Sequence, residues 1–347
     1  MAGKIKQWIK NGRDVALVQS VMPAMVAVVF AIGVGDFSLI LAVLSIIGVA
    51  AAHLCANILD DYFDYKVDMT GDRDKVIRKG FRAMTFKYPY LTDGTETLAT
   101  TWKAILNFAA VAGVCGLAIF VSRTIGNGLF GRCGSWWIPF LAGATAILAY
   151  FYSAPPLKLA YHGLGELEIG LIFGPMLMMG VYYSSCGVMD WSIVLVSIPV
   201  GILVLNILFT HSFIDMAGDE ECGKMTFARL IGSQKTCLIT SFAINFSPFV
   251  IVLFAVLRGI LNPLYLLTFI ALPRAIWLCR SLSEHYRGIN NLPQLPPRWL
   301  GPMMVSRWGE IREAGIDWFL MRWMTARNIL SAFCLGIIIA KILLLIF

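Results

Sequence analysis

The feature that most constrains this chain of 347 residues is a series of long apolar blocks. Each block is close to the ~20 residues that an α-helix needs to cross a bilayer. A helix also satisfies its own backbone N–H and C=O groups, as a lipid surrounding requires. A closed β-barrel would need alternating apolar and polar residues, whereas these blocks are apolar on all sides. The sequence therefore predicts an all-α integral membrane bundle.

The composition agrees with a lipid environment. Only 14% of the residues are charged, against ~25% in a typical soluble domain, and the mean hydropathy is +0.75. A net charge of +7 would suggest nucleic-acid binding in a soluble protein. Here the basic residues gather between the apolar blocks, where membrane orientation explains them. We therefore expect membrane lipid as a partner and no nucleic acid.

We predict about nine transmembrane helices in a single domain that covers residues 1–347. Two long polar connections, residues 65–100 and 283–325, contain Gly and Pro and are expected to form cap loops over a cavity. The predicted helices are residues 15–34, 38–64, 101–122, 134–152, 165–187, 191–215, 234–257, 262–282 and 326–347.

Lys and Arg are distributed unevenly over the two sides that these helices define. One side holds the N-terminal segment and nearly all basic loops, and the other has only Arg123, Arg132 and Arg258. The positive-inside rule places the N-terminus and the basic loops in the cytoplasm, in an inner or plasma membrane. No pattern of a removable signal peptide is expected. Cys133 and Cys186 would both lie on the outer side and could pair, although spacing alone shows no contact.

The first acidic cluster begins near Asn57 and contains Asp60, Asp61, Asp64 and Asp68. Spacings of three, four, seven and eight residues place these side chains on one face of a helix. Carboxylates on one face repel each other, and burial at a helix end increases the cost. Hard oxygen ligands of this kind suit Mg²⁺, which commonly bridges to substrate phosphates. The alternative is a solvated helix end that runs into a polar loop.

The second acidic cluster contains Asp215 and Asp219, with His211 one turn earlier and Lys224 shortly afterwards. It lies at the end of another predicted helix, on the same predicted side of the membrane. Two such stripes could together hold two metal ions and a diphosphate. The alternative is a cytoplasmic loop that is acidic by chance.

A third segment, YSAPPLKLAYHGLGELEIG, begins at Tyr152 and connects two predicted helices. Tyr152 and Tyr161 offer aromatic faces, which can stabilise a carbocation, and Lys158 adds a positive charge. The alternative is an interfacial belt of Tyr and Lys, and composition alone favours it.

Together, these three segments resemble the UbiA superfamily of intramembrane aromatic prenyltransferases. Asp60, Asp64 and Asp68 match the family's N/D-xxx-D-xxx-D pattern, and Asp215 and Asp219 match its D-xxx-D pattern. The GLGE element of the third segment is similar to the 1,4-dihydroxy-2-naphthoate, or menaquinone-type, branch, while YSAPPLKL is also similar to chlorophyll synthase. Asp60 and His211 stand where the family often has Asn.

The resemblance implies Mg²⁺-dependent transfer of a prenyl chain from a polyprenyl diphosphate donor to an aromatic small-molecule acceptor, 1,4-dihydroxy-2-naphthoate in menaquinone synthesis. Six aspartates would be catalytic and hold Mg²⁺, with the active site facing the cytoplasm: Asp60, Asp61, Asp64, Asp68, Asp215 and Asp219. Substrate contacts would come from Asn57, Arg82, Tyr152, Lys158, Tyr161, His211 and Lys224.

Two alternatives stay open. The acceptor could be 4-hydroxybenzoate, a chlorophyllide, haem or a lipid. The chain could also be a secondary transporter, because carboxylates in membranes often mark ion pathways. A transporter should place its charges near the midplane of the bilayer, whereas these aspartates lie at helix ends.

Overall fold

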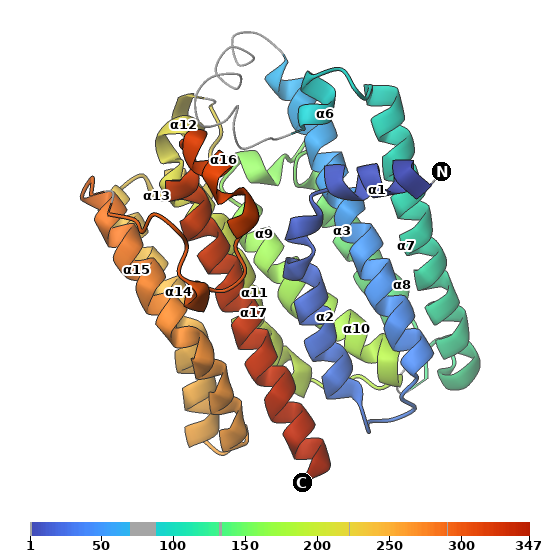
Figure 1. Ribbon diagram of the computed structural model, residues 1–347. Coiled ribbons are helices and arrows are strands. Elements are labelled where there is room, and N and C mark those ends of the chain that lie inside the picture. Colours follow the sequence, from blue (N-terminus) through green and yellow to red (C-terminus); the bar gives the residue numbers. More distant parts are fainter. Residues whose placement is uncertain (1, 70–87, 132–133, 222, 290) are drawn as a thin grey trace. The chain divides into compact units, whose positions relative to one another are not determined.

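A computed structural model describes residues 2–69, 88–131, 134–221, 223–289 and 291–347 (Figure 1). These residues form helices and connecting turns, together with one isolated backbone bridge, so the all-α prediction is confirmed. The chain divides into two compact units, each treated on its own below. Of the described residues, unit 1 holds those in the ranges 2–69, 88–158 and 171–197, and unit 2 holds those in the ranges 159–170 and 198–347. The single domain remains a prediction.

Unit 1 contains most of the first half of the chain. Its elements are α1 (Ala2–Asn11), η1 (Asp14–Ala16), α2 (Val18–Ala31), α3 (Leu39–Asp68), α6 (Pro89–Thr92), α7 (Leu98–Asn127), α8 (Trp137–Phe151), the π-helical η3 (Ile172–Met176) and α10 (Leu177–Cys186).

Unit 2 contains most of the second half. Its elements are η2 (Leu159–Tyr161), α9 (Gly165–Leu171), most of α11 (Ser192–Ile214), α12 (Met216–Glu221), α13 (Phe227–Ile231), α14 (Gln234–Leu257), η4 (Pro263–Ala271), α15 (Leu272–Tyr286), η5 (Arg298–Leu300), η6 (Val305–Arg307), α16 (Trp308–Glu313) and α17 (Asp317–Ile346).

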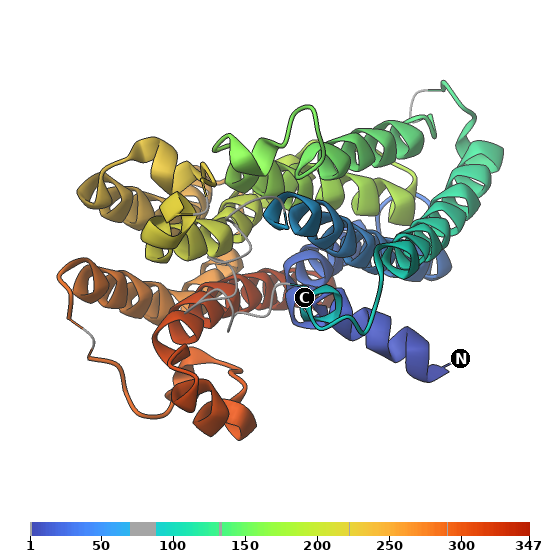
Figure 2. The same ribbon diagram turned by 90° about the horizontal axis from the view of Figure 1, so that it is seen from above.

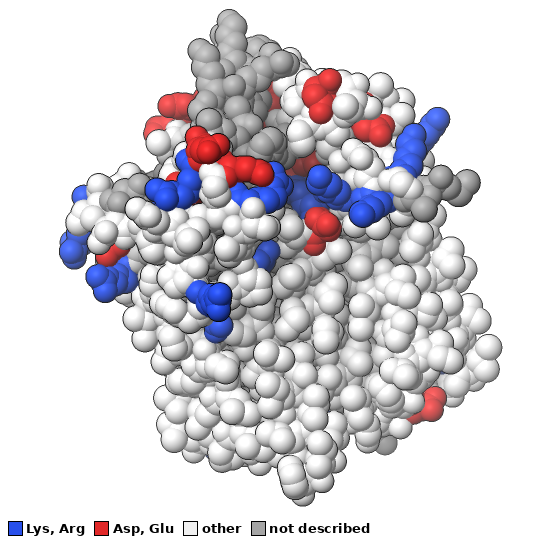
Figure 3. All heavy atoms as spheres, viewed as in Figure 1, with Lys and Arg blue, Asp and Glu red and all other residues white. Residues whose placement is uncertain are grey.

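Eight helical segments in the described part of the chain are long and apolar enough to cross a bilayer. The remaining predicted span, residues 134–152, corresponds to α8, a shorter apolar helix of 15 residues. Figure 3 shows that the visible sides of these helices carry few charged groups, which gather toward one end of the helices. The chain is therefore an integral membrane protein. The spans are Asp14–Ala31, Leu39–Asp68, Leu98–Asn127, Gly165–Cys186, Ser192–Ile214, Gln234–Leu257, Pro263–Tyr286 and Asp317–Ile346.

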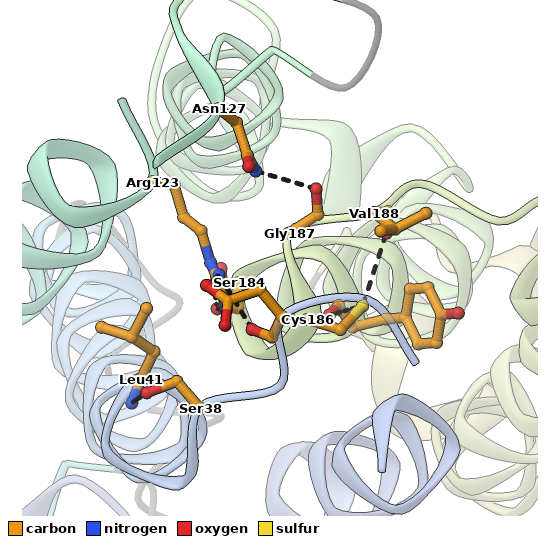
Figure 4. Close-up of polar contacts among 10 residues, drawn as sticks. Ser38, Leu41, Arg123, Asn127, Ser184, Cys186, Gly187 and Val188 are labelled. Atoms are coloured by element: carbon orange, nitrogen blue, oxygen red, sulfur yellow. Dashed lines mark hydrogen bonds and ion pairs between the residues drawn. The ribbon is translucent and has the colours of Figure 1, made fainter. Parts of the chain in front are cut away.

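The C-terminal ends of α7 and α10 in unit 1 are joined by a buried arginine (Figure 4). The Arg123 guanidinium donates to the carbonyl oxygen of Ser184 at 3.1 Å and to that of Asp36 at 3.0 Å. Arg123 thus satisfies one carbonyl group in the last turn of α10, where helical partners are missing, and one in the connection between α2 and α3. Cys186 lies beside this arginine as a buried free thiol. Cys133, which could have paired with it, lies outside the described residues.

A chain of buried polar contacts links three helices of unit 2. Asn206 of α11 donates to the side-chain oxygen of Asn245 in α14 at 2.9 Å, and Asn245 donates to the Cys279 sulfur in α15 at 3.2 Å. The last helix, α17, packs closely against η4 at Gly336, where a Cβ atom would lie 2.7 Å from the Leu267 carbonyl oxygen. A side chain at this position would separate the two elements.

The connection between α15 and α17 is shorter than the loop predicted over residues 283–325, and it contains η5, η6 and α16. α17 begins at Asp317, so the predicted start at residue 326 is wrong. Arg322 falls in the predicted loop and Arg327 in the predicted helix, but both are buried in α17 and donate to Ser281 and to the Pro302 carbonyl oxygen, respectively. Figure 2 shows the connection leaving α15, passing through α16 and returning to α17. Half of the other predicted cap, residues 65–100, lies outside the described residues, and its predicted start is wrong because α3 stays helical through Asp68.

Candidate active site

The first acidic cluster occupies the last turns of α3, which stays helical through Asp68. Asp61, Asp64 and Asp68 are only 1%, 1% and 7% exposed. The alternative prediction of a solvated helix end is therefore wrong for these three residues. The predicted helical face is therefore present and largely withdrawn from water. Carboxylates in such a place require compensating cations or hydrogen-bond donors.

A basic residue that the sequence analysis did not single out supplies one such cation. The Arg13 Nη2 atom lies 3.2 Å from Asp60 and 3.1 Å from Asp61, and it donates to the Asn57 carbonyl oxygen at 2.9 Å. Burial alone would lower the pKa of Arg13, but the two carboxylates outweigh it and raise the pKa above its ordinary value. Arg13 is therefore always charged. Its distance from the cluster in sequence hides this pairing.

Two tyrosines and a serine donate hydrogen bonds to the same carboxylates. Tyr88 donates to Asp68, Tyr90 donates to Asp61 at 3.0 Å, and Ser153 donates to Asp60. Burial, followed by the neighbouring carboxylates, raises the pKa of both phenols above the ordinary range. The phenols therefore remain protonated donors across the physiological range. No spacing rule in the sequence connects these residues with α3.

The third predicted segment meets the first cluster at Ser153, beside Tyr152 at the end of α8. Lys158 follows a cis peptide bond between Pro155 and Pro156, and its backbone N–H donates to the Ala154 carbonyl oxygen at 3.0 Å. Asn57, predicted to contact substrate, donates its side-chain amide to the Gly12 carbonyl oxygen at 2.8 Å. In the described part of the chain it anchors the N-terminal segment to α3.

The second acidic cluster lies where α11 passes into α12 in unit 2. Asp215 and Asp219 are 9% and 3% exposed, and the Asp219 N–H donates to the Asp215 carbonyl oxygen at 2.9 Å. The two residues are therefore one helical turn apart, as predicted. His211, one turn before them, packs edge-on against Phe319 with ring centroids 5.0 Å apart.

Two of the predicted substrate residues meet beside this cluster. The Lys224 ammonium lies 5.2 Å from the centre of the Tyr161 ring, in a cation–π contact. Arg229, which the sequence analysis did not single out, donates to the Lys224 carbonyl oxygen at 2.9 Å and to that of Asp219 at 3.4 Å. Arg229 of α13 therefore holds the backbone of the loop that runs from Asp219 to α13. Arg82 lies outside the described residues.

The donor atoms of the two clusters are suited to a hard divalent cation. All six aspartates offer oxygen, which Mg²⁺ prefers to nitrogen or sulfur. The described residues contain no group of three or more His, Cys, Asp or Glu side chains that could hold a metal ion by themselves. Mg²⁺ usually takes one or two carboxylates, water and substrate phosphates instead of a complete protein cage. The residues present therefore fit a magnesium ion that arrives with a phosphorylated substrate.

Comparison with known proteins identifies a prenyltransferase family and relatives that are named as prenyltransferases. The model of the UbiA prenyltransferase family matches residues 20–288. The chain is 22% identical to the 1,4-dihydroxy-2-naphthoate octaprenyltransferase of Bacillus subtilis, over 80% of this chain and 82% of that protein. It is 30% identical to the 2-carboxy-1,4-naphthoquinone phytyltransferase of Synechocystis, over 52% of this chain and 56% of that protein.

Solved structures share the fold. A UbiA homologue from Archaeoglobus fulgidus bound to DMAPP and Mg²⁺ has a TM-score of 0.57, with 16% identity over 93% of this chain and 99% of that chain. The same homologue bound to GPP and Mg²⁺ gives 0.54 over the same shares.

Proposed function

This chain belongs to the UbiA prenyltransferase family, and from that premise we propose that it transfers a prenyl group from a polyprenyl diphosphate to 1,4-dihydroxy-2-naphthoate in menaquinone synthesis. That it is a membrane prenyltransferase follows from the family. The donor, acceptor, metal and site residues are the proposal. The observation that carries them is the buried stripe of Asp61, Asp64 and Asp68 on the last turns of a membrane-spanning helix.

The proposal assigns Asp60, Asp61, Asp64 and Asp68 on α3, and Asp215 and Asp219 at the end of α11, as the magnesium ligands. Bound magnesium would supply positive charge that stabilises the diphosphate as its bond to the allylic carbon breaks. The six carboxylates would hold this metal at the ends of the two helices. The Asp60 and Asp61 pair also contacts Arg13, so the chain's own cation holds these carboxylates in place.

Lys224 is assigned to the leaving diphosphate, because a charged donor forms strong hydrogen bonds with phosphate oxygens. Its contact with the Tyr161 ring fixes the direction of the side chain. Arg82 and His211 are assigned to the same substrate from the resemblance. Tyr152 and Tyr161 are assigned to shield the allylic cation from water, with Lys158 and Asn57 at the margins of the site.

The membrane setting follows from the donor. A polyprenyl tail favours an apolar environment by ~0.8 kcal/mol for each buried CH₂ group. Helices that are exposed to lipid let the tail remain in the bilayer while its diphosphate is held at the helix ends. We place those ends, the N-terminus and the active site on the cytoplasmic side of an inner or plasma membrane, following the positive-inside rule.

The naphthoate acceptor is supported by the relatives, several of which bear 1,4-dihydroxy-2-naphthoate octaprenyltransferase as their name. To test it, purified protein would be incubated with geranylgeranyl diphosphate, 1,4-dihydroxy-2-naphthoate and Mg²⁺, with and without EDTA. Pyrophosphate release and prenylated product would be followed by mass spectrometry. We expect EDTA-sensitive prenylated naphthoquinol. Release of pyrophosphate without this product would reject the acceptor. Absence of both pyrophosphate and prenylated product, with donors of several lengths, would reject the proposal.

The metal assignment has its own variants. Asp64→Asn and Asp215→Asn should each lower turnover at least ~100-fold, because each removes a carboxylate that would hold the magnesium needed to stabilise the leaving diphosphate. Asp93→Asn, at an exposed position outside both clusters, is the matched control and should retain activity. Near-normal turnover in either cluster variant would remove that aspartate from the metal site.

A further inference from the structure

Glu166 is a buried carboxyl group in unit 2 that the proposed chemistry does not use. It lies in the first turn of α9, is 4% exposed and is not part of either aspartate cluster. Its Oε1 atom accepts two hydrogen bonds, from the Ser212 hydroxyl at 2.5 Å and from the Phe227 backbone N–H at 3.1 Å. Such a fully buried acceptor with two donors is costly to remove, because both donors would lose their partner.

The two donors stand on either side of the second acidic cluster. Ser212 is in the last turn of α11, just before Asp215, and Phe227 is the first residue of α13, just after Lys224. One carboxylate oxygen therefore joins both ends of the segment that carries Asp215, Asp219 and Lys224. Closing a loop at its base in this way restricts the positions its side chains can take.

Close packing holds α9 at the distance this link requires. Gly170 lies one turn after Glu166, on the same face of α9. A Cβ atom at Gly170 would lie 3.1 Å from the Gly201 carbonyl oxygen and 3.1 Å from Leu205 Cβ, both in α11. The missing side chain thus lets α9 and α11 approach closely enough for Glu166 to reach Ser212.

The segment before α9 supports the same loop. His162 forms a parallel backbone bridge with Met225, and the Tyr161 ring lies under the Lys224 ammonium. With the Phe227 contact, three successive interactions seat the loop on residues 161–166. Glu166 is the interaction that also reaches back to α11.

We infer that Glu166 is a positioning residue, whose side-chain oxygen sets Asp215, Asp219 and Lys224 in the arrangement that receives the magnesium diphosphate; this rests on the function proposed above. Glu166 acts as a hydrogen-bond acceptor and not through its charge. Supporting residues around a metal site typically contribute 10–100-fold in metal affinity or activity.

The chain offers a matched set of variants. Glu166→Ala removes the acceptor, Glu166→Gln keeps an oxygen that can accept both hydrogen bonds, and Ser212→Ala removes one donor. Glu168→Gln is the control, because Glu168 is equally buried on α9 but its carboxyl oxygens have no hydrogen-bond partner in the part of the chain that the structure describes.

The first measurement is the binding of Mn²⁺, a paramagnetic substitute for Mg²⁺, to the full-length protein in the presence of pyrophosphate. Binding is monitored by electron paramagnetic resonance. We expect Glu166→Ala to weaken binding ~10–100-fold and Ser212→Ala to weaken it less. Glu166→Gln and Glu168→Gln should stay within about threefold of the unchanged protein. Unchanged binding in Glu166→Ala, or loss in Glu166→Gln equal to that in Glu166→Ala, would overturn the inference. If Glu166→Ala is not monodisperse, the test rests on Ser212→Ala and Glu166→Gln. Normal Mn²⁺ binding by Ser212→Ala would then contradict the positioning role of Glu166.

The second measurement is the Mg²⁺ and donor dependence of product formation. A positioning role predicts that Glu166→Ala needs more Mg²⁺ and donor for half-maximal rate, while a loss of folded protein would lower the maximal rate alone and count against the role. Absence of any transfer by the unchanged protein would reject the proposed function. The Mn²⁺ comparison would still test Glu166, because it requires no turnover.

Discussion

Individual residues around the first acidic cluster explain how buried carboxylates are tolerated. Asp60 and Asp61 share Arg13, while Asp61 and Asp68 each accept a phenolic hydrogen bond. Partners of this kind convert a repulsive stripe into a hydrogen-bonded network. Two predictions at this scale separate the contribution of the cation from that of the phenols.

Replacing Arg13 with alanine should destabilise the metal-free protein, because two neighbouring carboxylates lose their shared cation. Added Mg²⁺ should restore much of the lost stability by supplying charge at the same place. The measurement is the melting temperature in detergent with EDTA and with Mg²⁺. Arg258→Ala, at an exposed position, is the control. A melting temperature for Arg13→Ala equal to the control in EDTA would contradict the role of this arginine.

Replacing Tyr90 with phenylalanine should cost about 1.5–3 kcal/mol, as for a hydrogen bond to a charged group. The pKa of the Tyr90 phenol is raised by burial and by Asp61. Its stabilising contribution is therefore fully present below the pKa of an unfolded tyrosine, ~10, and declines as the pH rises above that value. The melting-temperature gap to the unchanged protein should narrow between about pH 9 and about pH 11. Tyr286→Phe, at an exposed position, should show no gap, and a constant gap for Tyr90→Phe would exclude the linkage.

At the scale of elements, the connection between α15 and α17 contributes to a small hydrophobic core. Nearly all of this connection follows the residues 20–288 that match the family. Trp308 is fully buried among Leu300, Met303 and Met321, and Asn328 donates to the Leu300 carbonyl oxygen at 3.0 Å. The segment is therefore held as a folded appendage of unit 2.

Removing the Trp308 side chain should cost ~3–5 kcal/mol of local stability, the usual penalty for deleting a buried aromatic ring. Limited proteolysis should then cut between residues 291 and 316 faster than in the unchanged protein. Trp299→Ala is a matched control in the same segment, because that ring is 48% exposed and surface changes usually stay within ~0.5 kcal/mol. Equal cleavage rates for the two variants would show that the appendage has no core dependent on Trp308.

At the scale of the whole molecule, the membrane topology depends on α8. Its 15 residues extend only ~22 Å at 1.5 Å per residue, less than the ~30 Å of a hydrocarbon core. If all nine helices cross, the two termini lie on opposite sides, with the N-terminus in the cytoplasm. We expect reporter fusions at the two ends to report opposite compartments. Both reporters in one compartment would mean that one predicted span, most simply α8, does not cross.

The sequence by itself determined the class of fold, the approximate helices and the family, because hydropathy and helical spacing are local properties. The spacing of the aspartates was predictable, and Asp215 lies one turn from Asp219 as expected. The end of the helix that carries the first cluster was not, because it was predicted at residue 64 and α3 continues to Asp68. The start of α17 was not, because Arg322 lowers the local hydropathy and only the distant Ser281 hydroxyl makes its burial tolerable.

Only the tertiary structure decided which residues support the two clusters. Arg13, Tyr90 and Ser153 reach the first cluster, and Glu166 and Arg229 surround the second. Most of these partners are far apart in sequence, so no spacing rule relates them. Their pairing is set by helix packing, which brings a buried charge and its donors together because an isolated buried charge is too costly to persist.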